Sequence, residues 1–160
     1  MKTYKAYYKS PLGPIEVVAL QDSILSLDFV EEALAGDPDL PFCLKNGLKQ
    51  IDEYFRGKRK EFLLKLDPQG TNFQKLVWQQ LEKIPFGEVV SYGEIASIIG
   101  KPTACRAVGN ANGRNPIALI IPCHRVIGSD GRLTGYGGGL WRKEWLIKHE
   151  RGYSPNNIIA

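Results

Sequence analysis

The chain has 160 residues, of which 43% are hydrophobic and 24% are charged, and these proportions are ordinary for a globular protein. It carries 21 Lys and Arg against 17 Asp and Glu, which gives a net charge of +4. Its apolar runs are much shorter than the roughly 20 residues that a bilayer span requires, and no apolar signal core follows Lys2. Composition therefore excludes a membrane protein and predicts a cytoplasmic protein without a targeting signal.

The N-terminal part of the chain has the pattern of a small antiparallel sheet. Short β-branched and aromatic segments, separated by turn residues, predict strands at 3–8, 15–20 and 24–29. Apolar residues at helical spacing between Leu44 and Phe55 predict a helix, and Gly57 supplies its end. Residues 62–66 are a further strand candidate.

A linker and a change of charge coincide at Asp67-Pro68-Gln69-Gly70. Residues 1–69 carry 10 basic and 11 acidic side chains, whereas residues 70–160 carry 11 and 6. We therefore predict an N-terminal α/β domain over 1–69 and a basic C-terminal domain over 70–160. The basic excess suits a polyanion such as nucleic acid, but it is too modest to identify one.

Beyond the linker the apolar spacing becomes helical. Thr71-Asn72-Phe73-Gln74 reads as a capping box at the start of one helix. Ser91-Tyr92-Gly93-Glu94 predicts a second box before a short helix that Gly100 ends, and Thr103 can cap a third helix ending near Asn112. Two short helices joined by a tight turn form a candidate helix-turn-helix.

The third predicted helix consists mostly of small residues around a single arginine, Arg106. Small residues let a helix backbone approach another surface closely. Two interpretations stay open at this point. Either the helix packs tightly against another helix with Arg106 in solvent, or it presses against DNA with Arg106 as a probe.

The segment Pro122-Cys123-His124-Arg125-Val126 places a thiol beside one of only two histidines in the chain. The apolar run at 117–121 predicts a buried strand that delivers the thiol, and a glycine-rich loop at 135–139 follows. A thiol becomes a nucleophile when its surroundings favour the thiolate. The pattern indicates a reactive site, while a buried structural thiol is the alternative.

The other two cysteines, Cys43 and Cys105, show no sign of activation and are expected to be structural. Three cysteines without C-x-x-C spacing argue against a disulfide framework. No second Cys and His pair accompanies Cys123 and His124, which argues against zinc. We expect no metal and no cofactor.

In their order and spacing these features resemble the O6-alkylguanine-DNA alkyltransferases. The matching segments span about residues 71–150: Tyr92, the Arg106 helix, Asn115-Pro116, 122–126, 135–139 and the helix ending in His149-Glu150. The resemblance implies an α+β fold. Its N-terminal α/β domain would hold an antiparallel, ribonuclease H-like sheet, and its mainly helical C-terminal domain a winged-helix-like helix-turn-helix element.

The resemblance implies suicidal repair of DNA by direct damage reversal, with base flipping. Cys123 would accept the alkyl group of O6-alkylguanine irreversibly, and O4-alkylthymine is a second candidate substrate. His124 would reach Cys123 through water, and Glu150 would orient His124. Asn115 would hold the surrounding backbone, and Tyr92 would hydrogen-bond the base and stabilise its charge as it leaves.

Further residues follow from the same resemblance. The substrate pocket would be completed by backbone groups of Val126, Tyr136, Gly137 and Gly138. The position of Gly137 is a serine in many family members, so its contact to O6 would be limited to the backbone N–H. The DNA contacts would involve Thr103, Arg106, Ala107, Arg114 and Tyr92, with Arg106 filling the vacated stack in a minor-groove complex.

Simpler readings of these residues stay open. His124 can be a satisfied core histidine, Tyr92 a packed side chain at a helix start and Glu150 a surface charge. Asn115 can belong to a helix-ending turn. At the level of function, the competitors are a helix-turn-helix protein that binds lesions without chemistry and a cysteine hydrolase. We expect a monomer on double-stranded DNA containing O6-alkylguanine, with clustering on DNA left open.

Overall fold

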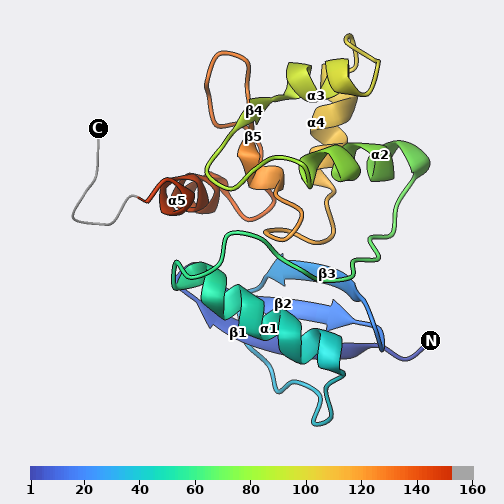
Figure 1. Ribbon diagram of the computed structural model, residues 1–160, viewed down its shortest axis with the longest axis vertical. Coiled ribbons are helices and arrows are strands. Elements are labelled where there is room, and N and C mark those ends of the chain that lie inside the picture. Colours follow the sequence, from blue (N-terminus) through green and yellow to red (C-terminus); the bar gives the residue numbers. More distant parts are fainter. Residues whose placement is uncertain (153–160) are drawn as a thin grey trace. The chain divides into compact units, whose positions relative to one another are not determined.

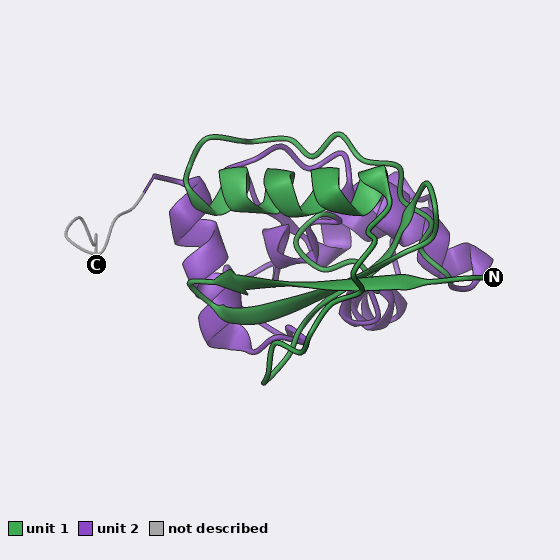
Figure 2. Cartoon of the chain, turned by 90° about the horizontal axis from the view of Figure 1, so that it is seen from below, with its two compact units in different colours: residues 1–69, 116–120 green, residues 70–115, 121–160 purple. Residues whose placement is uncertain are grey.

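The computed structural model describes residues 1–152; the C-terminal tail at 153–160, whose role the sequence leaves open, lies outside the described residues. Within the described part, the chain forms two compact units (Figure 2). Unit 1 comprises residues 1–69 and 116–120, and unit 2 comprises 70–115 and 121–152. No helix in residues 1–152 combines the length and the apolar character that crossing a membrane demands.

Unit 1 is a three-stranded antiparallel sheet with one helix on a face (Figure 1). Its elements are β1 (Tyr4–Ser10), β2 (Gly13–Ala19), β3 (Ile24–Phe29) and α1 (Phe42–Phe55). Alternate residues of β2, namely Ile15, Val17 and Ala19, are fully buried, as the two-residue period of a strand requires. The predicted meander and helix are confirmed, with small shifts at their ends.

The outer edge of β1 is covered by the loop that follows β3. The Asp37 N–H donates to the Lys5 carbonyl at 2.9 Å, and the Lys5 N–H donates to Asp37 Oδ2 at 2.7 Å. An open strand edge offers unpaired backbone groups to other chains. The loop that follows β3 therefore protects this edge of the sheet through Asp37.

Two strand predictions are wrong. Residues 62–66 form only an isolated parallel bridge, between Leu66 and Ile24. The run at 117–121 makes a single parallel bridge, between Ile117 and Leu27, before the chain turns at Leu119, whose φ is 71°. Most apolar residues of the run at 117–121 are buried, as the sequence predicts. A short apolar run does not by itself determine an extended backbone, however.

Unit 2 is mainly helical and also contains a two-stranded parallel pair (Figure 1). Its elements are α2 (Asn72–Leu81), β4 (Val90–Ser91), α3 (Tyr92–Ile98), α4 (Cys105–Gly113), a 3-10 turn η1 (Cys123–Arg125), β5 (Val126–Ile127) and α5 (Leu140–Glu150). α2 and α3 both pack on α4. The buried Trp78 connects α2 to α4, because its Nε1–H donates to the carbonyl of Ala111 in α4 at 2.8 Å.

The helix caps agree with the sequence in part. The predicted box of α2 is present: Thr71 Oγ1 accepts from the Gln74 N–H at 3.1 Å, and Gln74 Oε1 accepts from the Thr71 N–H at 2.9 Å. Ser91 caps α3 by accepting from the Glu94 N–H at 3.1 Å, and Gly100 ends it with a φ of 78°.

The cap predicted for Thr103 is wrong. α4 begins at Cys105 with Ala104 as its N-cap residue and no side-chain cap. The Ala104 N–H donates to the Lys101 carbonyl at 2.9 Å, so Thr103 lies inside a turn and is not placed to cap the helix.

These contacts predict different effects for two threonine substitutions. Thr71→Ala should lower the free energy of unfolding by about 1 kcal/mol, because it removes one half of a capping box. Thr103→Ala should change it by less than about 0.5 kcal/mol, since an exposed turn hydroxyl caps no helix. Urea unfolding followed by circular dichroism measures both, and equal losses would contradict the assignment of the caps.

Candidate active site

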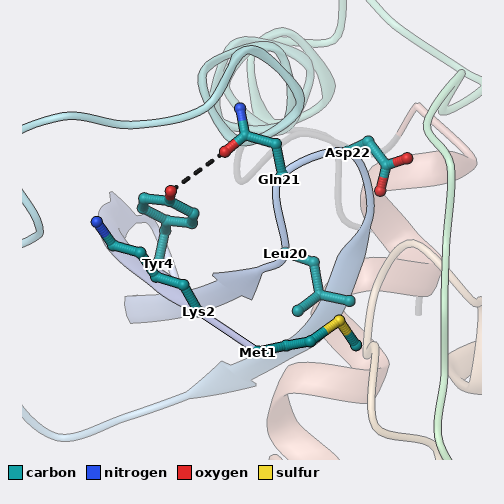
Figure 3. A pocket seen from close by; sticks show the side chains of 6 residues that line it. All are labelled: Met1, Lys2, Tyr4, Leu20, Gln21 and Asp22. Carbon is teal, nitrogen blue, oxygen red and sulfur yellow. Dashed lines mark hydrogen bonds between the residues drawn. The ribbon is translucent and has the colours of Figure 1, made fainter.

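A shallow pocket of about 210 Å³ opens in unit 1 (Figure 3). It is lined by Met1, Lys2, Tyr4, Leu20, Gln21 and Asp22. The Tyr4 hydroxyl donates to Gln21 Oε1 at 3.1 Å, so one of its few polar groups is already satisfied within the protein. None of the residues predicted for chemistry line this pocket, and the candidate site lies in unit 2.

Cys123 opens η1 and is held there through the backbone. Only 6% of the surface of Cys123 is exposed. Two asparagines at the end of α4 grip the chain on either side of Pro122: Asn115 Nδ2 donates to the Ile121 carbonyl at 2.7 Å, and Asn112 Nδ2 donates to the Cys123 carbonyl at 3.3 Å. The structure thus gives Asn115 the backbone contact that was expected of it, and adds Asn112, which the sequence did not indicate.

The surroundings of the thiol do not favour a resting thiolate. Burial raises the pKa of Cys123, although a hydrogen bond from the Asn115 side chain and the charge of Lys143 act in the opposite direction. The thiol is therefore protonated near neutral pH. A base has to take its proton before or during any reaction.

His124 follows Cys123 in η1 and is the candidate for that base. Its side chain is completely buried, and Nε2 lies 2.6 Å from Glu150 Oε2. Because an ionised carboxylate only accepts, Nε2 carries the proton and Nδ1 is left with a free lone pair. Nδ1 has no hydrogen-bond partner among residues 1–152. Burial lowers the pKa of His124 and outweighs the opposing effect of Glu150, so the imidazole is neutral.

Glu150, at the end of α5, is buried and ionised. Besides His124 it accepts from Arg125 Nε at 2.7 Å, from Arg125 Nη2 at 3.0 Å and from the Gly87 N–H at 3.3 Å. Burial opposes its ionisation, but the charges and hydrogen bonds of His124 and Arg125 prevail and hold the pKa of Glu150 well below its ordinary value. The surface-charge reading of Glu150 is therefore wrong.

Tyr92 and the buried Lys143 bind the same carbonyl, that of Thr134, which precedes the glycine-rich loop at 135–139. The Tyr92 hydroxyl donates to the Thr134 carbonyl at 3.0 Å. Lys143 Nζ donates to the same carbonyl at 2.7 Å and to the Tyr92 hydroxyl at 3.5 Å. Lys143 is fully buried, and burial lowers its pKa to about 8.

Sequence reasoning missed Lys143, although a signal was present. Lys143 stands three residues before the buried Leu146 and seven before Glu150, and residues at this spacing share one helix face. A lysine on the buried face of a helix is unusual, because burying an ammonium group is costly unless it is paired.

The residues predicted to form the substrate pocket lie in β5 and in the loop between β5 and α5. Val126 is fully buried in β5, where it pairs with Val90 of β4. Burial raises the pKa of the Tyr136 hydroxyl well above its ordinary value, and the nearby Cys123 adds to this effect. A Cβ added to Gly137 would meet no atom within 4 Å, so this position leaves open space. The Gly138 carbonyl is held by Arg142 Nη1 at 2.6 Å.

Of the five residues predicted to contact DNA, Tyr92 is half-buried, and the other four are exposed: Thr103, Arg106, Ala107 and Arg114. α4 packs through its other face, where Val108, Ala111 and Asn112 are buried. Arg106 and Ala107 therefore lie outside the packed face of α4 and are available to a partner.

Comparison with known proteins identifies the family of this chain. The model for the DNA binding domain of 6-O-methylguanine DNA methyltransferase matches residues 72–152, and the model for its ribonuclease-like domain matches residues 3–68. The chain belongs to the O6-alkylguanine-DNA alkyltransferase family. The resemblance inferred from the sequence is confirmed, and the match to a DNA-binding domain supports DNA as a partner of this family member.

Relatives extend the likeness along almost the whole chain. A methylated-DNA--protein-cysteine methyltransferase of Methanosarcina barkeri is 50% identical over 92% of this chain and 96% of its own length. The crystal structure of Mycobacterium tuberculosis O6-methylguanine methyltransferase is 44% identical, covers 96% of both chains and has a TM-score of 0.86. A structure of the Mycobacterium tuberculosis protein OGT in complex with DNA also has a TM-score of 0.86, at 45% identity and 96% coverage of both chains. These matches confirm the α+β fold.

The burial of the thiols predicts their order of reaction with iodoacetamide. At pH 7 the exposed Cys105 should be modified first, and Cys123 at least about tenfold more slowly, because alkylation needs an accessible thiolate. Peptide mass mapping over time measures this order. In guanidinium chloride the difference should disappear, and preferential labelling of Cys123 in the folded protein would contradict a buried, neutral thiol.

Proposed function

We propose that this chain repairs DNA by direct damage reversal, transferring the alkyl group of O6-alkylguanine in duplex DNA irreversibly to Cys123. The chain would then act as a methylated-DNA--protein-cysteine methyltransferase that works once. The observation that carries this proposal is the cluster at η1, where a buried thiol adjoins a neutral histidine whose Nδ1 is free to accept a proton. It occurs in a chain whose relatives carry that name.

The transfer step begins with the removal of the thiol proton. His124 Nδ1 takes the proton from Cys123 through a water molecule, while Nε2–H stays bonded to Glu150. The thiolate attacks the alkyl carbon, a carbon–sulfur bond forms, and the bond between that carbon and O6 breaks with its electron pair passing to the guanine. The product is a thioether, for which no easy reversal exists, so each molecule acts once.

Departure of the guanine needs a proton or a compensating charge. Tyr92 donates its hydroxyl proton toward the base as the negative charge develops. The ammonium group of Lys143, which lies 3.5 Å from the Tyr92 hydroxyl, favours this transfer because it stabilises the negative charge left on the tyrosine. Its influence also reaches Cys123, since its charge favours the thiolate.

Access to the base requires that it leave the duplex, at a cost of a few kcal/mol. α4 presents its small, exposed face to the minor groove, Arg106 fills the vacated stack, and Thr103, Ala107 and Arg114 flank it. The extruded base enters a pocket formed by Val126, Tyr136, Gly137 and Gly138. The protein acts as a monomer, with residues 1–69 as an N-terminal domain and 70–160 as the reactive domain.

Mass spectrometry with O6-methylguanine DNA tests the transfer itself. The intact protein should gain one methyl group, located on Cys123, and the gain should stop at one equivalent. Cys123→Ser should bind DNA but acquire no methyl group, because a serine hydroxyl is scarcely ionised at neutral pH. Cys43→Ser is the matched control and should react as the wild type does. An unchanged wild-type mass would favour a lesion-binding protein, and repeated turnover would favour a hydrolase.

Arg106→Ala tests base flipping separately from chemistry. The variant should repair duplex DNA at least about tenfold more slowly, because the vacated stack is no longer filled, and should react with free O6-benzylguanine at the wild-type rate. Arg56→Ala, on the surface of α1, is the control and should affect neither substrate. Equal losses on both substrates would show that Arg106 has no part in flipping.

A further inference from the structure

Arg125 is a buried cation that the transfer mechanism does not use. Its side chain is only 8% exposed, and each arm of the guanidinium has a partner. Nε and Nη2 grip the two oxygens of Glu150 at 2.7 and 3.0 Å, and Nη1 donates to the Ile84 carbonyl at 2.6 Å. The guanidinium carbon also lies over the Phe86 ring, 5.8 Å from its centroid.

Glu150 is therefore shared between two nitrogen bases of different strength. A buried carboxylate next to an imidazole ordinarily favours the imidazolium, since the charge needs a counterion. Here the Arg125 guanidinium already supplies that counterion through a two-pronged contact. His124 is left to donate one hydrogen bond to the carboxylate from a neutral ring.

A second cation, Lys143, acts on His124 in the same direction as Arg125. Glu150 alone raises the pKa of His124, whereas burial, Arg125 and Lys143 lower it. Lys143 belongs to α5 and Arg125 to η1, so the two charges that act on the imidazole come from different elements. Of the two, only Arg125 contacts the carboxylate.

We propose that Arg125 is a positioning residue that neutralises and orients Glu150, so that His124 stays neutral, with its proton on Nε2 and Nδ1 free to act as the base. The charge state is a property of the free protein. Its use in taking the proton of Cys123 rests on the proposed function. The arrangement differs from a simple cysteine–histidine–carboxylate triad, because the carboxylate charge is balanced before the reaction begins.

The inference can be tested by nuclear magnetic resonance without DNA, since the chain has only two histidines. In the wild type, ¹⁵N shifts should show His124 neutral at pH 7 with the proton on Nε2. In Arg125→Met the pKa of His124 should rise, because the buried carboxylate loses its counterion. Arg125→Lys, which restores the charge, should return His124 toward its wild-type titration.

The outcomes separate an electrostatic role from a merely structural one. If Arg125→Met does not fold, Arg125→Gln replaces it, because the amide keeps donors but not the charge. A wild-type imidazolium at pH 7, or an unchanged His124 titration in a folded uncharged variant, would overturn the inference.

A second measurement connects the charge state to reactivity. The rate of reaction with free O6-benzylguanine should fall toward acid pH in wild type and variant, and the fall should begin at higher pH in the uncharged variant. Loss of rate by the same factor at every pH would assign Arg125 a packing role only. If the wild type itself does not react, the proposed function fails, whereas the histidine titration still decides the role of Arg125.

Discussion

One ionised carboxylate, Glu150, holds the candidate site of unit 2 together. Its two oxygens bind the η1 turn through His124 and Arg125, and the loop after α2 through the Gly87 N–H. Glu150 thereby connects both segments to α5, which carries it. Burying such charges is expensive, and an ion pair in a protein interior often adds little net stability. Loss of one partner is costly, however, because it strands a charge without water. The cluster is thus better understood as a device for fixing geometry and charge than as a source of stability.

Under the proposed function, the thiolate of Cys123 forms only when a substrate is in place. Burial keeps Cys123 protonated and His124 neutral, so neither group of the future ion pair is charged in the free protein. Because the thiolate is the form that reacts, a cysteine that rests as a thiol is less exposed to oxidation and to other electrophiles. Such protection has particular value in a protein that is used up by a single event, since each wasted thiol is a wasted molecule.

The sequence predicted the elements with local signals and missed those that depend on distant contacts. The capping box at Thr71 and the alternation in β2 are local, and both are present. The strand expected at 117–121 is absent because Leu119 adopts a left-handed backbone that no pattern announces. Lys143 and Arg125 were overlooked because charged side chains are usually at the surface. Their partners, Tyr92 and Glu150, are 51 and 25 residues away, so proximity appears only in three dimensions.

The return of residues 116–120 to unit 1 has a practical consequence for dissecting the molecule. The Leu27 N–H donates to the Pro116 carbonyl, and the Ala118 N–H donates to the Leu27 carbonyl, so β3 sequesters a segment that lies three residues before the thiol. A fragment starting at residue 70 would keep every group of the Glu150 cluster but leave Ile117 and Leu119, both nearly inaccessible in the whole chain, facing water. Shortening the protein in this way would therefore expose apolar side chains a few residues before Cys123.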